Sequence, residues 1–162
     1  MFKVGIITAS DKGFKNERVD ESGKVIKEII CNKGYTVDEY IILPDDKEQL
    51  KNELIKMCDV LKVNLILTTG GTGFSKRDVT PEATLEVIER ETPGISEAMR
   101  FNSLNYTPRA MLSRGVSGIR NNTLIINLPG SPKAVRECLD YILDSIHHGL
   151  EILLGLDSEC SR

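Results

Sequence analysis

The chain has 162 residues, of which 40% are hydrophobic and 28% charged, and its formal net charge is −3. This length fits one domain with a sizeable core, and without a basic block a nucleic-acid partner is not expected. No apolar run reaches the roughly 18 residues that a membrane span needs, and the first residues enter a strand without the layout of a signal peptide.

The first half of the chain alternates apolar strands with amphipathic helices. The pattern predicts a strand over residues 3–9, a polar loop over 10–20, a helix over 21–33, a strand over 36–43, a helix after Asp45 and Asp46, and a strand over 64–69. Strands that alternate with helices are typical of a parallel sheet covered by helices.

A glycine turn, residues 70–73, ends the third strand. Thr80 is placed to cap the next helix, predicted over 81–90, with Pro81 at its first position. Glycines allow close approach of a ligand, and a helix start suits an anion such as phosphate. The run lacks the Walker A and dinucleotide fingerprints. A tight turn without a ligand therefore remains an open alternative.

The second half predicts a helix over 95–105, a turn near 110–113, a hairpin of strands 116–120 and 123–128, and a last helix over 131–154. Ser131 can cap that helix, with Pro132 next, so Pro129, Gly130 and Ser131 form a second candidate anion site. Lys133 in its first turn fits an anion, although a solvated surface lysine is the favoured interpretation.

The predicted fold is a single-domain, three-layer α/β/α arrangement over residues 1–155, with a mainly parallel sheet, an antiparallel hairpin strand and a polar tail over 156–162. Right-handed crossovers place every turn after a parallel strand at one edge of the sheet, where ligands bind in such folds. The residues expected there are Ser10-Asp11, Asp45-Asp46, Gly70 to Asp78 and Gly130-Ser131.

The cysteines and histidines predict no metal site. Cys31, Cys58 and Cys138 fall in helical patterns as small core residues, and Cys160 is remote from them. Adjacent His147 and His148 point about 100° apart on a helix. A reduced, cytoplasmic protein is the expectation.

Four aspartates follow predicted strands: Asp11, Asp45, Asp46 and Asp78. Each has a simpler explanation, since Asp45 or Asp46 could cap a helix, Asp11 could stabilise its own turn and Asp78 could be a solvated turn residue. Together, beside two candidate anion sites, they fit Mg²⁺, which takes one or two carboxylates plus phosphate oxygens. Ser75 and Ser131 lack a histidine partner for nucleophilic catalysis.

Three runs resemble the MogA/MoaB family of molybdenum cofactor biosynthesis. They are Thr68-Thr69-Gly70-Gly71-Thr72-Gly73, Arg77-Asp78-Val79-Thr80-Pro81-Glu82-Ala83-Thr84 and Leu128-Pro129-Gly130-Ser131-Pro132-Lys133-Ala134. Shorter matches are Ser10-Asp11, Asp20-Glu21-Ser22-Gly23, Leu43-Pro44-Asp45 and Leu112-Ser113-Arg114. The resemblance covers nearly the whole chain and implies the family's molybdopterin-binding fold.

The resemblance also implies an activity: transfer of AMP from Mg-ATP to the terminal phosphate of molybdopterin, with release of pyrophosphate. It implies catalytic roles for Asp45 and Asp78. It further implies nucleotide and pterin contacts at Ser10, Asp11, Gly70, Gly71, Thr72, Gly73, Ser75, Pro129, Gly130 and Ser131. Mg²⁺ is the implied cofactor, a molybdate-insertion protein the downstream partner, and a homotrimer or hexamer the assembly. Independently of the resemblance, the capped helix starts after Gly73 and Gly130 predict nucleotide binding at the carboxyl edge of the sheet. Gly71→Val should then block ligand approach without unfolding the domain.

Two departures keep alternatives open. Lys12 stands where many relatives have arginine, and the chain lacks the insertion near the end of MogA-like members. Its length is closer to MoaB-like members, some of which are inactive. The alternatives are a non-catalytic pterin-binding protein and a nucleotide pyrophosphatase of the CinA type. Asp45 and Asp78 argue against the first, and the lack of a companion domain against the second.

Overall fold

The computed structural model describes residues 1–156, and its centre is one twisted sheet. Within these residues the sheet has six strands in the order β2-β1-β3-β6-β5-β4. The bounds are β1 Lys3–Ala9, β2 Thr36–Leu43, β3 Leu65–Thr69, β4 Arg90–Glu91, β5 Ser117–Arg120 and β6 Thr123–Leu128. The neighbouring pairs among β2, β1, β3 and β6 are parallel, whereas β5 and β4 are antiparallel to their neighbours.

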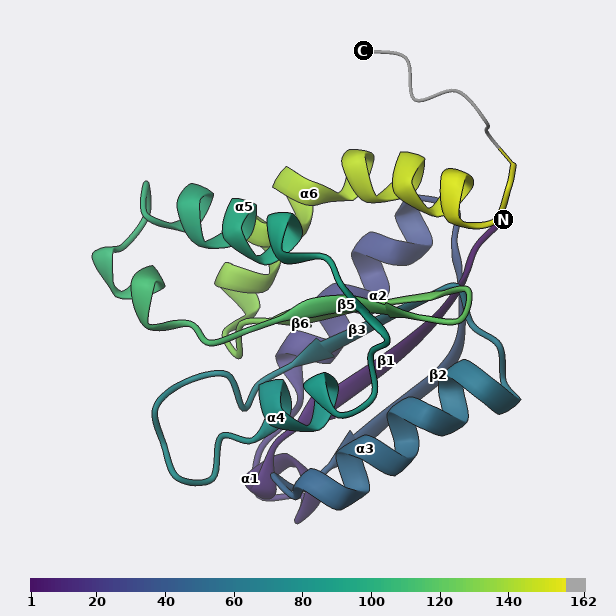
Figure 1. Ribbon diagram of the computed structural model, residues 1–162. Helices are drawn as coiled ribbons and strands as arrows, with labels where there is room; N and C mark the ends of the chain where they lie inside the picture. The colour runs from purple at the N-terminus through teal and green to yellow at the C-terminus, as the bar shows by residue number, and fades with distance from the viewer. Residues whose placement is uncertain (157–162) are drawn as a thin grey trace.

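Helices cover both faces of the sheet (Figure 1). One layer contains α2 (Glu21–Asn32), α5 (Pro93–Ser103) and α6 (Pro132–Leu153), and the other contains α3 (Lys47–Ile55), its π-helical continuation η1 (Lys56–Val60) and α4 (Thr80–Leu85). The predicted three-layer α/β/α fold is therefore confirmed.

Alternate side chains of the central strands point to opposite faces of the sheet and pack in two separate hydrophobic cores. Leu65 and Leu67 pack in the core under α2, α5 and α6, whereas Ile66 packs in the core under α3 and α4. Both faces of β3 are apolar, and all five of its residues are buried. Burial on both faces is expected for a parallel strand covered by helices.

Most predicted elements are found, but the region after the glycine turn differs. The helix predicted over 81–90 ends at Leu85, and Arg90–Glu91 forms β4 instead. The backbone N–H of Glu89 donates to Ile119 O at 2.8 Å, so pairing with β5 overrides the helical pattern. The predicted loop over 10–20 contains a short helix, α1 (Asp11–Phe14), capped by Ser10.

The remaining predictions have mixed outcomes. Asn121, with φ of 51°, turns the predicted hairpin between β5 and β6, and the turn near 110–113 is a 3-10 helix, η2 (Pro108–Leu112). Cys31 is exposed, so its assignment to the core was wrong, whereas Cys58 and Cys138 are buried. The predicted tail lies outside the described residues except for Leu156. Among described helices none is long and apolar enough to cross a membrane.

Candidate functional site

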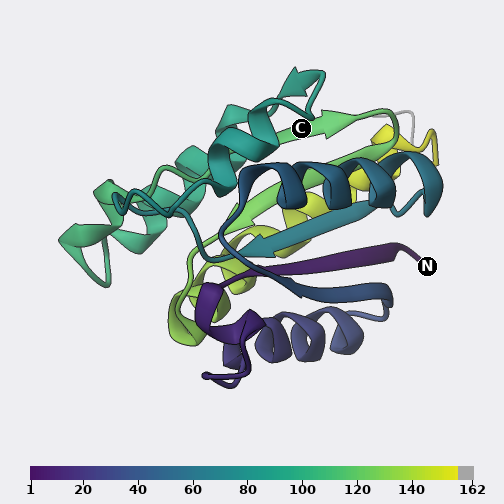
Figure 2. The same cartoon turned by 90° about the horizontal axis from the view of Figure 1, so that it is seen from below.

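The carboxyl ends of four parallel strands meet at one edge of the sheet (Figure 2). The register pairs Ala9 with Leu43, Thr8 with Thr69, and Thr69 with Leu128, so the strands end nearly level. The segments that follow, which begin at Ser10, Pro44, Gly70 and Pro129, are therefore neighbours. This edge brings together the residues that the sequence placed there.

Asp11 and Asp45 are joined by reciprocal hydrogen bonds at the ends of β1 and β2. The N–H of Asp11 donates to Asp45 Oδ2 at 3.1 Å, and the N–H of Asp45 donates to Asp11 Oδ1 at 3.0 Å. The capping role belongs to the next residue, because Asp46 accepts from the N–H of Gln49. Asp45 is therefore not the cap of α3, and its Oδ1 lies toward Gly71.

Arg77 supplies the counter-charge to Asp11. Its Nε and Nη2 donate to the two carboxylate oxygens of Asp11 at 3.0 and 2.9 Å. These hydrogen bonds lower the pKa of Asp11. The pKa of Asp45 is raised, mainly by burial and also by the carboxylates of Asp11 and Asp78. The two aspartates thus have opposite shifts.

The glycine turn is shaped by left-handed backbone and by Thr80. Gly70 has φ of +89° and Gly71 φ of +67°, a region that favours glycine. A Cβ on Gly70 would lie 2.3 Å from Ala9 O, so only glycine fits against the end of β1. The Thr80 hydroxyl donates to Gly70 O at 3.0 Å.

These contacts correct two predictions. Thr80 is the first residue of α4, not its cap, and Val79 at the cap position makes no side-chain cap bond. Gly71→Val cannot test ligand approach alone, because a Cβ there would lie 2.3 Å from Thr80 Oγ1 and the positive φ is itself strained.

Asp78 closes the loop that follows the glycine turn. Its Oδ2 accepts from the N–H of Ser75 at 3.0 Å, and Ser75 Oγ accepts from the N–H of Arg77 at 3.2 Å. A Cβ on Gly73 would lie 2.9 Å from Asp78 Oδ2. Asp45 and Asp78 therefore each lie beside a glycine of the turn.

The segment 129–131 lies against the glycine turn. Pro129 O accepts from the Thr69 hydroxyl and Gly130 O from the Ser22 hydroxyl, both at 2.7 Å. A Cβ on Gly130 would lie 3.5 Å from the Cα of Gly70. Ser131 caps α6 as predicted, accepting from the N–H of Ala134. The two turns after β3 and β6 therefore form one surface.

Two hollows open on either side of this surface. The first, here the η2 cavity, measures about 290 Å³, and its lining includes Thr72, Gly73, Arg100, Ser113, Pro129 and Glu137. The second, here the α2 cavity, measures about 400 Å³, and its lining includes Ser10, Arg18, Asp20, Ser22, Gly70 and Gly130. The glycine turn and the segment 129–131 contribute residues to both hollows.

Sequence reasoning missed several of these residues. Arg100, Arg109 and Glu137 come from elements that only the tertiary structure brings to the η2 cavity. Arg100 is held at the cavity by a hydrogen bond from its Nη1 to Gly115 O at 2.8 Å. The run Leu112-Ser113-Arg114 was the one signal for this wall of the cavity.

Comparison with known proteins identifies a family model and several relatives that match most of the chain. Residues 5–148 match a family model described as a probable molybdopterin-binding domain. The chain is 45% identical over 154 residues to the molybdopterin adenylyltransferase of Helicobacter pylori J99, covering 94% of this chain and 88% of that protein. Identity to the molybdopterin adenylyltransferase of Escherichia coli K12 is 38%, over 91% and 79% of the two chains.

A solved structure has nearly the same backbone. The molybdopterin biosynthesis enzyme MoaB of Thermus thermophilus superimposes with a TM-score of 0.90 at 48% identity. The match covers 96% of this chain and 98% of that chain. The likeness therefore extends over the whole sheet and the edge that carries Asp45 and Asp78.

Proposed function

The chain belongs to the family of molybdopterin-binding domains, and from this membership and the acidic strand edge we propose that it is a molybdopterin adenylyltransferase of molybdenum cofactor biosynthesis. In the proposed reaction an oxygen of the molybdopterin phosphate forms a bond to the α-phosphorus of ATP. The bond from that phosphorus to the β-bridging oxygen breaks, and pyrophosphate leaves. The products are adenylylated molybdopterin and pyrophosphate.

The observation that carries this proposal is the position of Asp45 and Asp78 beside the glycine turn, which contributes residues to the lining of both hollows. A ligand in each hollow would bring its phosphate to the turn, where glycine permits close approach. Holding two phosphates in line supplies much of the catalysis in such transfers. We propose that Asp45 and Asp78 are the catalytic carboxylates at this turn.

The donor set fits Mg²⁺ carried in with ATP. Among residues 1–156 no group of three or more His, Cys, Asp or Glu side chains could hold a metal alone. Mg²⁺ usually takes one or two carboxylates and completes its shell with phosphate oxygens and water. Asp45 and Asp78 would hold the ion, which supplies charge neutralisation of the phosphates when bound. Asp11 is less suited, because Arg77 occupies both of its oxygens.

The α2 cavity suits the nucleotide. Asp20 and Ser131 cap the first turns of α2 and α6, and Ser22 and Pro132 from those turns line the hollow. Helix N-termini stabilise anions through the backbone dipole. Arg18 adds a cation to the same lining.

The η2 cavity suits the pterin. The amino and amide N–H groups along one edge of a pterin can donate hydrogen bonds to a carboxylate. The Glu137 side chain, which is 16% exposed, lines this cavity and could accept them. Arg100 and Arg109 in the lining can meet the phosphate and the carbonyl groups. The two substrates would then approach the glycine turn from opposite sides.

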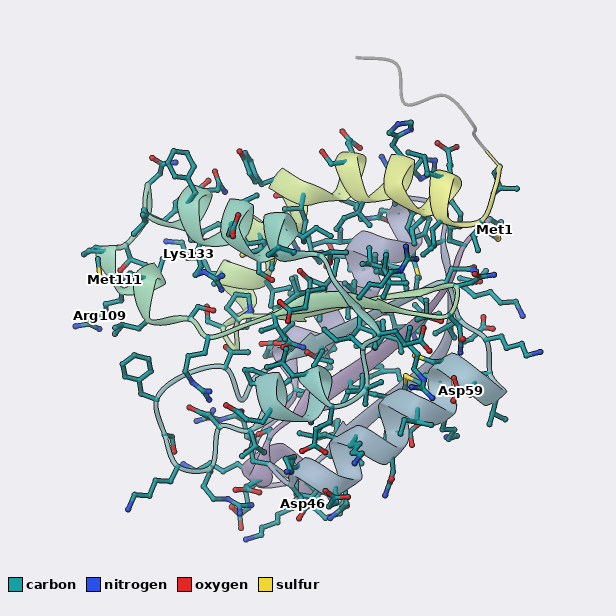
Figure 3. The ribbon with its side chains drawn as sticks, viewed as in Figure 1. Met1, Asp46, Asp59, Arg109, Met111 and Lys133 are labelled. Atoms are coloured by element: carbon teal, nitrogen blue, oxygen red, sulfur yellow. The ribbon has the colours of Figure 1, made fainter. Side chains whose placement is uncertain are left out.

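We also propose a homotrimer, or a hexamer built from it. Large apolar side chains are exposed around α5 and η2, with Phe101 71% and Met111 66% exposed. Figure 3 shows Met111 and Arg109 at the outer end of the molecule. Contiguous exposed apolar surface indicates an interaction site. The molybdate-insertion partner and the cytoplasmic location stay predictions.

One experiment tests the proposed function: incubation with Mg-ATP and molybdopterin, with product identification by mass spectrometry. Adenylylated molybdopterin with one pyrophosphate per turnover is the expected result. AMP and pyrophosphate formed without molybdopterin would indicate a pyrophosphatase. Pterin binding without any turnover would indicate a non-catalytic pterin-binding protein.

A further inference from the structure

The loop that carries Asp78 has little support of its own. Residues 74–77 are exposed and belong to no helix or strand. Within the loop, the N–H of Asp78 donates to Ser75 O and Asp78 Oδ2 accepts from the N–H of Ser75, both at 3.0 Å. These two bonds give the loop a local shape. They do not fix its position relative to Asp45. Arg77 ties the middle of the loop to Asp11, but through a side chain that is 62% exposed, so the two ends of the loop need a further support.

A single guanidinium holds both ends of this loop. Arg114 Nε donates to Gly73 O at 2.7 Å, and its Nη2 donates to Asp78 O at 2.8 Å. The N–H of Arg114 also donates to Thr72 O at 2.9 Å. The planar fork of arginine allows the two carbonyl bonds at once. A lysine has one donor nitrogen and could not reproduce both of these hydrogen bonds in the same geometry.

Glu82 keeps the guanidinium in this orientation. Arg114 Nη1 donates to Glu82 Oε1 in the first turn of α4. Burial acts to raise the pKa of Glu82, but the bond from Arg114 lowers it below the ordinary value. The ion pair is therefore formed at neutral pH. Arg114 uses its Nε, Nη1 and Nη2 on protein atoms and has its side chain 33% exposed.

The residues on either side of Arg114 belong to the wall of the η2 cavity. Ser113 and Gly115 both line it, and Arg100 Nη1 donates to Gly115 O at 2.8 Å. Arg114 thus connects the wall proposed to face the pterin with the loop that carries Asp78. This holds the backbone of Asp78 at a fixed separation from that wall.

We infer that Arg114 is a positioning residue that holds Asp78 for the adenylyl transfer, through its bonds to the carbonyls of Gly73 and Asp78. The inference rests on the proposed function. Arg114 acts on the loop and not on the reacting atoms. Small displacements of a catalytic group are costly, and a shift of about 1 Å can reduce turnover about a hundredfold.

The test uses Arg114→Gln with Arg120→Gln as the matched control. Arg120 also pairs with a carboxylate, Asp59, and donates to a backbone carbonyl, Val87 O, but it lies on β5 away from the site. We expect Arg114→Gln to lower kcat per folded molecule by roughly tenfold to a hundredfold, with KM for both substrates changed less than about threefold. Arg120→Gln should lower the melting temperature and leave kcat unchanged.

Two further variants separate positioning from stability. Arg114→Lys retains the charge opposite Glu82, so it should fold while still losing at least about tenfold in kcat. In a double variant, Arg114→Gln should reduce the turnover of Asp78→Asn by less than about twofold, because the residue it positions is already neutral. Independent, multiplicative losses would overturn the inference.

A readout that does not need activity is limited trypsin digestion. Lys76 and Arg77 are exposed tryptic sites inside the loop. Arg114→Gln should accelerate cleavage there by about tenfold, as expected when roughly 1.4 kcal/mol of local ordering is lost, and Arg120→Gln should not. Unchanged cleavage at residues 76–77 would overturn the inference even if the adenylyltransferase assay succeeds. Absence of that activity with faster cleavage would overturn only the proposed function.

Discussion

Asp11 and Asp45 each accept a hydrogen bond from the other's backbone N–H, which locks together the first turns after β1 and β2. Only one oxygen of Asp45, Oδ2, is used in this exchange. Its Oδ1 lies toward the glycine turn. The paired arrangement therefore leaves Asp45 rigidly placed with one oxygen directed to the proposed reaction site.

Neutralising either proposed catalytic carboxylate should reduce turnover strongly. Asp45→Asn and Asp78→Asn preserve shape and remove charge, so each should lower kcat by roughly a hundredfold or more. Pterin affinity should change little. Steady-state rates and pterin titration measure both quantities. Full activity in Asp78→Asn would remove the main support for the catalytic assignment.

The control for this experiment is the neighbouring aspartate. Asp46 caps α3 by accepting from the N–H of Gln49 at 2.9 Å, and asparagine also caps helices. Asp46→Asn should therefore keep near-normal turnover and lose about 1 kcal/mol or less of stability. An equal loss of turnover in all three variants would indicate a general charge effect at this edge.

The opposite pKa shifts of Asp11 and Asp45 predict opposite pH effects on stability. The pKa of Asp11 is lowered in the folded protein. Asp11 therefore stabilises the fold at pH above the unfolded pKa of about 4, and this stabilisation is lost as pH falls through the lower folded pKa. The pKa of Asp45 is raised in the folded protein. Asp45 therefore contributes its full stability at pH below the unfolded pKa of about 4, and this stability is lost as pH rises through the folded pKa.

Melting curves between acidic and neutral pH check these signs. At neutral pH Asp11→Asn should lower the melting temperature and Asp45→Asn should raise it. Both differences from the unsubstituted protein should shrink toward acidic pH. Differences of the same sign at neutral pH would contradict the assignment of the two shifts.

Glycine substitutions should divide into a strained and a tolerated position. Gly71→Ala forces a side chain into φ of +67° and against Thr80, so it should lower the melting temperature by at least about 2 °C. Gly130→Ala meets only an ordinary contact with Gly70. It should keep the melting temperature and raise KM for ATP by about tenfold, or roughly 1.4 kcal/mol of binding.

The proposed trimer predicts that a charge in the exposed apolar surface dissociates the assembly. Phe101→Glu should shift light scattering toward the 18.0 kDa monomer, with no loss of helix by circular dichroism. Val60→Glu is the control, because Val60 is 72% exposed but belongs to η1, beside Asp59 at the opposite end of Figure 3. A monomeric unsubstituted protein at micromolar concentration would contradict the assembly.

The order of helices and parallel strands was predictable because it depends on local periodicity. Apolar runs such as 65–69 and the cap at Ser131 act within a few residues of sequence. The same is true of the hairpin at Asn121, where asparagine tolerates a positive φ. These elements needed no knowledge of distant contacts.

The errors arise where distant contacts decide. The Thr80 hydroxyl bonds to Gly70 O, and the chain after Leu85 leaves the helix to pair with β5. The Arg77–Asp11 pair joins residues that are 66 positions apart. A single sequence gives no signal for such partners, so the roles of Arg77, Arg100 and Arg114 became visible only in the fold.

Both ends of the described chain lie at the far end of the sheet from the strand edge that carries the aspartates. Figure 3 places Met1 beside the end of α6 and opposite Arg109 and Met111. A strand of seven residues such as β1 spans roughly 20 Å. A surface tether or fluorescent tag attached at Met1 would therefore stand a strand length or more from Asp45, which follows the strand paired with β1. Protein immobilised through Met1 should therefore keep both hollows open to substrate.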